Sequence, residues 1–468
     1  LEKDTVSVVQ YICKLTKATK TEGIFSLRKT PNGLFFAERI NMLKKMKRFL
    51  GCVREYKKAT IITLILIVGE AAIETFIPFI TADLVNQING GVEMGNVVRT
   101  GILLVVMAIF SLSFGGIAGF TCSKASAGFA KNLRRDLYSK VQTYTFGNID
   151  RFSSSSLVTR MTTDVANIQM SYMMIIRTAV RAPLMLIFSI IMAYIMGGAL
   201  ATCFVIVVPV LAFGLMMIGK AAMPAFRRVF KKYDRLNESI EENVRAMRVV
   251  KGFSREDYEK KKFGVAAEDI RKDFTKAERI VALNAPLMQV CLYFNMVFIL
   301  LVGSRLTISS GGSLVDVGQI SAMLTYGFQI LMSLMMLSMI FVMITMADES
   351  AKRVCEVLSE EATLENPENP VFEVADGSID FNNVSFKYSR KAKKNSLEDI
   401  DLHIRSGETI GIIGGTGSGK SSLIQLISRL YDATEGEVKV GGRNVKEYDL
   451  DTLRNTVAVV LQKNLLFS

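Results

Sequence analysis

Six long apolar stretches dominate the pattern of hydrophobic and polar positions along the chain. About 20 apolar residues allow a helix to cross the ~30 Å hydrocarbon core of a bilayer. Each stretch meets or approaches that length, and none has the regular polar face of a helix buried in a large soluble protein. The pattern therefore predicts six membrane-spanning helices, at residues 59–88, 101–121, 173–199, 201–219, 281–303 and 317–347.

The connections between these stretches alternate in length and charge. Short ones, such as residues 89–100 and 304–316, hold few basic residues, whereas the long ones at residues 122–172 and 220–280 are rich in Lys and Arg. Cytoplasmic connections of membrane proteins carry the excess of positive charge. We therefore expect the long connections, and with them both termini, to lie in the cytoplasm.

The long connections keep helical spacing over residues 125–144, 161–172 and 222–250. This spacing predicts that the membrane helices continue well past the bilayer. Short reversals at residues 148–156 and 252–257 each carry an aromatic residue and charges at the tip. By composition, such a tip fits a contact with another domain and an ordinary solvated turn equally well.

A polar linker punctuated by proline, residues 364–370, precedes a change of periodicity. Period-2 alternation is typical of strands, and strands are expected at residues 378–381, 384–388, 400–404, 409–413 and 437–440. The predicted fold is multidomain: an all-α membrane domain with long cytoplasmic extensions, followed by an α/β domain. We assign the membrane domain to residues 42–350, the linker to 351–375 and the α/β domain to 376–468.

Residues 414–421 fit the pattern G-x-x-x-x-G-K-[ST] of a phosphate-binding loop, between the expected strand 409–413 and a helix expected at 421–431. Glycines let successive backbone N–H groups point at one anion, and a helix N-terminus adds its positive dipole end. Lysine in this position reaches the β and γ phosphates, and the following serine can ligate Mg²⁺. A nucleoside triphosphate and Mg²⁺ are therefore expected to bind here, and a glycine-rich turn that binds nothing is disfavoured. The expected contacts are Gly414, Gly415, Thr416, Gly417, Ser418, Gly419, Lys420, Ser421 and Ser422, with Ser421 on the metal.

Composition agrees with a membrane protein. Half of the 468 residues are apolar, the mean hydropathy is +0.31, and the net charge is +13. Basic residues that alternate with membrane segments favour a charged membrane face over nucleic-acid binding, for which no motif is present. The six cysteines are far apart in the sequence, so neither a disulfide framework nor a zinc site is indicated.

Residues 1–41 are mixed in character and lack the order of charged, apolar and small residues that a signal peptide has, and we assign them no function. Met42 opens a basic amphipathic stretch. One hypothesis is that the natural protein starts at Met42.

These features together resemble a half-transporter of the ABC exporter superfamily, in its multidrug and lipid exporter branch, with membrane and ATP-binding domains fused in one chain. Several local patterns carry the resemblance. Asp150-Arg151-Phe152 looks like the first coupling loop of that family, and Arg248-Val249-Val250-Lys251-Gly252-Phe253 looks like the second. The resemblance implies that both loops contact nucleotide-binding domains.

The resemblance also implies roles for two residues outside the phosphate loop. Tyr388 stands where such proteins place an aromatic residue under the adenine ring, and a tyrosine face is a suitable stacking surface. Gln462 ends the strand expected at residues 459–462, Val459-Val460-Leu461-Gln462, and matches the glutamine that holds Mg²⁺ or the attacking water.

Family features that would follow are missing before Ser468: the signature loop, the acidic residues that end a second strand, and the switch histidine. Phosphoryl transfer needs a positioned nucleophile as well as cradled phosphates. We therefore expect a nucleotide domain truncated at its C-terminal side. Such a chain by itself would bind ATP weakly without hydrolysing it, whereas the complete parent would be an ATP-hydrolysing transporter.

The resemblance implies ATP-driven export of a hydrophobic or amphipathic drug, lipid or peptide across the plasma membrane, in partnership with a second half-transporter that is identical or different. The alternative is a non-transporting nucleotide-binding membrane subunit that acts as a sensor or assembly partner. For the substrate, the methionine-rich last stretch is either an adaptable surface or ordinary packing. The intramembrane charges Glu70, Glu74, Arg177 and Arg181 either pair with one another or select charged substrates.

Overall fold

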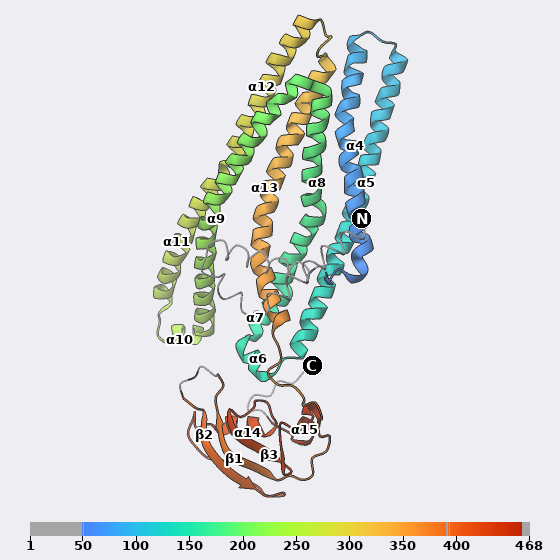
Figure 1. Cartoon of the computed structure of the whole chain (residues 1–468). Coiled ribbons are helices and arrows are strands. Elements are labelled where there is room, and N and C mark those ends of the chain that lie inside the picture. The colour runs from blue at the N-terminus through green and yellow to red at the C-terminus, as the bar shows by residue number, and fades with distance from the viewer. Residues whose placement is uncertain (1–48, 50, 390–391, 393, 461–468) are drawn as a thin grey trace, which may run out of the picture. The chain divides into compact units, whose positions relative to one another are not determined.

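The computed structural model describes residue 49 and residues 51–460, apart from 390–391 and 393. The chain divides into two compact units (Figure 1). The first holds the described residues up to Asn132 together with Ala166–Ser350, and the second holds Leu133–Val165 together with Ala351 and the described residues that follow it. Each unit is described by itself.

Long helices make up the first unit. They are separated by short turns, and several continue well beyond the length that a bilayer requires. The helices and short helical turns, including the parts of α5 and α13 that belong to the second unit, are η1 (Arg54–Tyr56), α4 (Lys57–Asn89), α5 (Met94–Gln142), α8 (Val165–Gly197), η3 (Gly198–Ala201), α9 (Thr202–Arg245), α10 (Met247–Gly252), α11 (Glu256–Ala282), α12 (Asn284–Ser310) and α13 (Val317–Ser359).

Six helical segments of the described residues are long and apolar enough to cross a membrane, which confirms the predicted all-helical membrane region. Their bounds are Arg54–Asn89, Met94–Gln142, Ser154–Gly197, Thr202–Phe226, Glu256–Ser310 and Val317–Phe341. The predicted helical extensions are also present, since α5 runs to Gln142 and α9 to Arg245. Figure 1 shows α9 and α11 side by side along these extensions.

Close packing between helices holds the core of the first unit. Tyr326 is fully buried in α13, and its hydroxyl donates to the backbone oxygen of Thr75 in α4 at 2.9 Å. Gly197 leaves room for Met323, because a Cβ at this glycine would lie 2.5 Å from the Met323 Sδ. Outward residues such as Phe120 are exposed and apolar, as lipid contact requires. The core comprises Ala82, Met192, Ala193, Leu200, Ala201, Phe204, Ile299, Val315, Ala322, Met323, Tyr326 and Ile330.

The second unit combines a helical hairpin with a small α/β region. The hairpin, residues 133–165, is called the first hairpin below. It consists of the end of α5, α6 (Phe146–Arg151), α7 (Ser154–Thr159) and one π-helical turn, η2 (Arg160–Asp164). The α/β region contains β1 (Ile379–Phe386), β2 (Leu397–Ile404), α14 (Lys420–Ile427), β3 (Glu435–Val440), β4 (Arg443–Asn444) and α15 (Leu450–Thr456).

The four described strands form one antiparallel sheet in the order β2-β1-β3-β4. The two strands expected at 378–381 and 384–388 are a single strand, β1, with a register shift around Asn383, whose φ is +45°. Apolar residues on the sheet pack against α14 and α15. This core comprises Phe381, Val384, Phe386, Leu397, Leu423, Leu426, Val438, Val440, Val445, Tyr448 and Leu453.

Two local predictions around the phosphate loop are wrong. Residues 409–413 do not form a strand, and Ile413 is 98% exposed. A strand needs a neighbour to complete its hydrogen bonds, and none of the described strands pairs with this segment. The helix expected over 421–431 ends at Ile427, because Arg429 adopts a left-handed conformation, with φ +48°, and bonds to the Asp432 carboxylate at 3.0 Å.

Candidate nucleotide site and first hairpin

The conformation of the phosphate loop depends on glycine at defined positions. Gly417 and Gly419 have φ values of +84° and +89°, in the left-handed region that side chains disfavour. A Cβ at Gly419 would lie 2.8 Å from the backbone oxygen of Ser396 and 2.7 Å from Leu397 Cδ2. The loop is therefore pressed against the start of β2, and only glycine fits there without strain.

Helix α14 begins directly behind the loop, at Lys420, and no described side chain caps its N-terminus. The first N–H groups of a helix have no partner within the helix, and they carry its positive dipole end. Ser421 is exposed in this first turn. The arrangement provides the backbone donors and the hydroxyl that a phosphate group and its Mg²⁺ need.

Lys420 bends back over the loop. Its Nζ donates to the backbone oxygens of Gly414 and Gly415, both at 2.7 Å, and to the Ser418 hydroxyl at 3.3 Å. The ammonium group therefore sits above the concave side of the loop, where phosphate oxygens could replace the carbonyls with charge-assisted bonds. The residues present fit the triphosphate of a nucleotide.

Tyr388 lies beside α14. Its hydroxyl bonds to the buried hydroxyl of Ser422 and to Gln425 Oε1, each at 2.9 Å. The ring meets Phe386 edge-on at 4.8 Å between centroids, and it stays 49% exposed. Adenine stacking on this exposed ring stays a prediction.

The part of the chain that the structure describes holds no group of three or more His, Cys, Asp or Glu residues that could hold a metal ion. Mg²⁺ bound together with a nucleotide would take the Ser421 hydroxyl and phosphate oxygens as ligands. Gln462, the other expected ligand, lies outside the described residues. Val459 and Val460, which precede it, are not in a strand, so the described part of that strand prediction is wrong.

The first hairpin contacts the α/β region that carries the phosphate loop, which is called the nucleotide region below. The Tyr431 hydroxyl donates to Asp150 Oδ2 at 2.5 Å, and the Tyr431 ring meets Phe146 edge-on at 6.1 Å. The contact implied by the Asp150-Arg151-Phe152 pattern therefore exists for this hairpin. Neither Tyr431 nor Phe146 was predicted, since a tyrosine after a helix and a phenylalanine before a turn carry no distinctive spacing.

The first hairpin is also bound to the end of α13 and the chain that follows it. Arg151 forms an ion pair with Glu360 at 2.7 Å, and the buried Asn148 donates to the backbone oxygen of Glu361 at 2.9 Å. Arg353 holds the buried Asp164 through two bonds, of 2.5 and 2.8 Å, at the π-helical turn. These contacts join the first hairpin to the end of α13, which is called the linker helix below, and to the chain that follows it.

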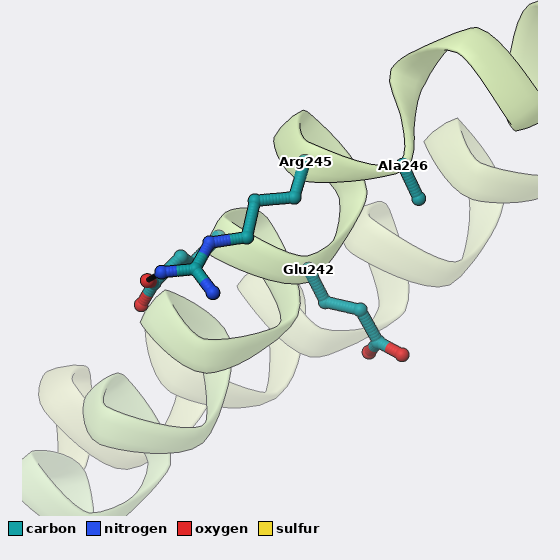
Figure 2. A pocket seen from close by; sticks show the side chains of 4 residues that line it. Glu242, Arg245 and Ala246 are labelled. Carbon is teal, nitrogen blue, oxygen red and sulfur yellow. Dashed lines mark hydrogen bonds and ion pairs between the residues drawn. The ribbon is translucent and has the colours of Figure 1, made fainter. Parts of the chain in front are cut away.

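The second hairpin, residues 247–258, lies in the other unit, and its expected contact with a nucleotide domain stays a prediction. Phe253 at its tip is 76% exposed. An open hollow of about 510 Å³ borders this hairpin at the end of α9 (Figure 2). Its lining, from Glu241 to Ala246, includes an ion pair of 2.6 Å between Arg245 and Glu241 on one helix face. The hollow provides no convergent groups for a ligand.

Three of the intramembrane charges, Glu70, Glu74 and Arg181, are paired. Arg181 on α8 binds both oxygens of Glu74 on α4, at 2.6 and 2.7 Å, and lies 3.6 Å from Glu70. Glu70 is buried, and a Cβ at Gly115 would lie only 2.9 Å from its Oε1. This geometry favours the structural alternative, in which these charges join α4 to α8.

A helical region with six candidate spans and a phosphate-loop region in one chain define the class of nucleotide-powered membrane transporters. Residues 60–344 match the family described as ABC transporter transmembrane region, and residues 397–468 match the family described as ABC transporter. The first match covers more than half of the chain. The protein therefore belongs to the ABC transporter family, with the membrane and ATPase regions fused.

Several curated proteins are similar over most of the chain. The uncharacterized ABC transporter ATP-binding protein YfiB of Bacillus subtilis is 29% identical over 423 residues, which cover 90% of this chain and 73% of that protein. The uncharacterized ABC transporter ATP-binding protein MT1311 of Mycobacterium tuberculosis is 32% identical over 418 residues, covering 89% and 71%. A putative ABC transporter ATP-binding protein of Mycoplasma pneumoniae, the MG014 homolog, is 29% identical over 370 residues, covering 78% and 59%.

Proposed function

We propose that this protein is one half of a dimeric exporter that uses ATP to move a hydrophobic or amphipathic substrate out across the plasma membrane. The observation that carries the proposal is the phosphate loop fused to six candidate spans, with the first hairpin bonded to the nucleotide region through Asp150 and Tyr431. ATP and Mg²⁺ would bind at residues 414–422, with the adenine ring on Tyr388 and with Gln462 near the metal.

The orientation follows from charge. The long connections hold the basic residues, and the positive-inside rule places them, the nucleotide domain and both termini in the cytoplasm. Two halves are needed because one chain carries one phosphate loop, and the resemblance implies an ATP site that a partner subunit completes. The substrate surface would include exposed methionines of α13 such as Met339, which is 61% exposed and can adapt to different apolar ligands.

Transport into inverted membrane vesicles tests the proposal. Vesicles from cells that produce the protein with its natural partner should accumulate an amphipathic fluorescent dye when Mg-ATP is added. Lys420→Ala should reduce this uptake by at least about tenfold, because a charge-assisted contact to phosphate is lost. Lys394→Ala, at an exposed lysine of the same region, should leave uptake unchanged.

Two outcomes would contradict the exporter. Uptake that persists undiminished in Lys420→Ala would show that the phosphate loop does not drive it. Mg-ATP binding without uptake of dye, lipid or peptide probes would instead favour the non-transporting sensor or assembly subunit.

A further inference from the structure

A continuous series of contacts links helix α14 to the first hairpin. Ser422, in the first turn of α14, bonds to the Tyr388 hydroxyl at 2.9 Å. The Tyr388 ring meets the Tyr431 ring edge-on, at 5.1 Å between centroids and with an interplanar angle of 86°. The Tyr431 hydroxyl then donates to Asp150 Oδ2 at 2.5 Å. All four residues belong to the second unit.

Tyr431 also packs against two aromatic rings outside this series. Its ring packs against Phe386 of β1 at 5.6 Å and against Phe146 of α6 at 6.1 Å. Burial, and next to it the carboxylate of Asp150, raise the pKa of Tyr431, so its hydroxyl keeps its proton and acts as a donor at neutral pH. Aromatic rings that meet edge-to-face have a preferred geometry, and a displaced ring therefore shifts its neighbour.

On the hairpin side, α6 has little freedom to move alone. Arg151, the residue after Asp150, pairs with Glu360 at 2.7 Å. Asn148, two residues before Asp150, is buried and donates to the backbone oxygen of Glu361 in the linker. A shift of Tyr431 against Asp150 is therefore transmitted to the hairpin and the linker helix together, because packed and hydrogen-bonded networks move between discrete arrangements.

We propose that Tyr431 is the positioning residue that couples the nucleotide site to the first hairpin, through the path Ser422–Tyr388–Tyr431–Asp150. The proposal rests on ATP binding at the phosphate loop, as in the proposed function. Tyr431 does not touch the phosphates. It fixes the hairpin relative to Tyr388, so that a nucleotide that orders the Tyr388 ring also orders α6.

Hydrogen–deuterium exchange of the purified full-length transporter tests this path without requiring transport. Mg-ATP should slow exchange in α6 of the wild type by at least about fivefold, since ordering of a segment raises its protection. Tyr431→Phe removes only the hydroxyl and should abolish this slowing, with ATP affinity within about twofold of wild type. Tyr448→Phe is the matched control, because it removes a buried hydroxyl of the same region that donates to the Val440 oxygen at 2.8 Å. It should keep the wild-type response.

Asp150→Ala provides a second variant, which removes the acceptor of this bond at an exposed residue and should not affect folding. It should lose the response as Tyr431→Phe does, and the double variant should lose no more than either single variant, because both act on one contact. Slowing of α6 by Mg-ATP that survives in Tyr431→Phe or in Asp150→Ala overturns the proposal, and so does a wild-type α6 that does not respond to Mg-ATP. A wild-type response in α6 without dye uptake would refute the exporter while supporting this path.

Discussion

The close approach of Gly419 to β2 predicts that this glycine cannot be replaced without loss of nucleotide affinity. In Gly419→Ala the new Cβ would enter the left-handed region at φ +89° and meet the Ser396 backbone oxygen at 2.8 Å. The left-handed conformation costs about 1–2 kcal/mol for a residue with a side chain. Overpacking against backbone that cannot move away adds about 1–3 kcal/mol.

The cost of the left-handed conformation and the cost of overpacking add to about 2–5 kcal/mol, and ATP binding loses this free energy if it requires the native loop. Since 1.4 kcal/mol corresponds to a tenfold change in affinity, we expect ATP to bind at least about tenfold more weakly. The assay is titration of the purified protein with a fluorescent ATP analogue, followed by competition with ATP. Gly415→Ala is the matched control, because alanine keeps the backbone N–H that would face the phosphates, a Cβ there meets no atom within 4 Å, and the residue is not in the left-handed region. It should bind within about twofold of wild type.

The reasoning would be refuted by a folded Gly419→Ala variant with wild-type ATP affinity. It would be refuted equally by a Gly415→Ala variant that loses as much affinity as Gly419→Ala. The first result would mean that the strain of the loop is relieved elsewhere. The second would mean that added volume in the loop, and not its backbone conformation, weakens binding.

Three further predictions concern contacts outside the loop. Glu74→Gln should destabilise the protein by about 1–3 kcal/mol because it breaks a partly buried ion pair. The charge-swapped variant E74R/R181E should recover part of the lost stability, and thermal unfolding in detergent measures both variants. If Glu74→Gln changed the range of transported dyes while its stability stayed normal, substrate selection would be favoured instead. Asp164→Asn should cost about 1–3 kcal/mol of unfolding free energy, because two charge-assisted bonds from Arg353 are weakened; an unchanged melting temperature would contradict this. Burial raises the pKa of Tyr144 to about 12, so the contribution of its protonated hydroxyl to the free energy of unfolding is complete below pH ~10 and is lost as the pH rises to about 12. Tyr144→Phe should therefore flatten the decline of the free energy of unfolding over that pH interval. An equally steep decline in the variant would refute the attribution of this decline to Tyr144.

Much of the fold was predictable because the relevant signals are local. The six spans depend on the length and hydropathy of contiguous segments, and the helical extensions such as residues 222–250 depend on spacing within one helix. The phosphate loop is likewise one contiguous pattern, and the left-handed Gly419 occurs where the pattern requires glycine.

The wrong predictions concern segments whose structure depends on distant partners. Residues 409–413 have strand-like composition, but composition does not supply the neighbour that a strand needs. The helix expected to reach residue 431 ends at Ile427, since Arg429 leaves the helix and donates to the backbone oxygens of Glu365 and Lys446, which helical spacing does not reveal.

By itself, then, the sequence determined the class of the protein: a membrane region of six helices joined to a phosphate loop, and hence a nucleotide-powered transporter. Only the tertiary structure decided how these parts are joined. Asp150 and Tyr431 lie 281 positions apart, and Asp164 and Arg353 lie 189 apart. Glu74 could have faced a substrate or an arginine, and the packing of α4 against α8 selected Arg181. Short-range patterns fix elements because backbone geometry repeats within a segment, whereas the partner of a side chain is fixed only when the segments pack.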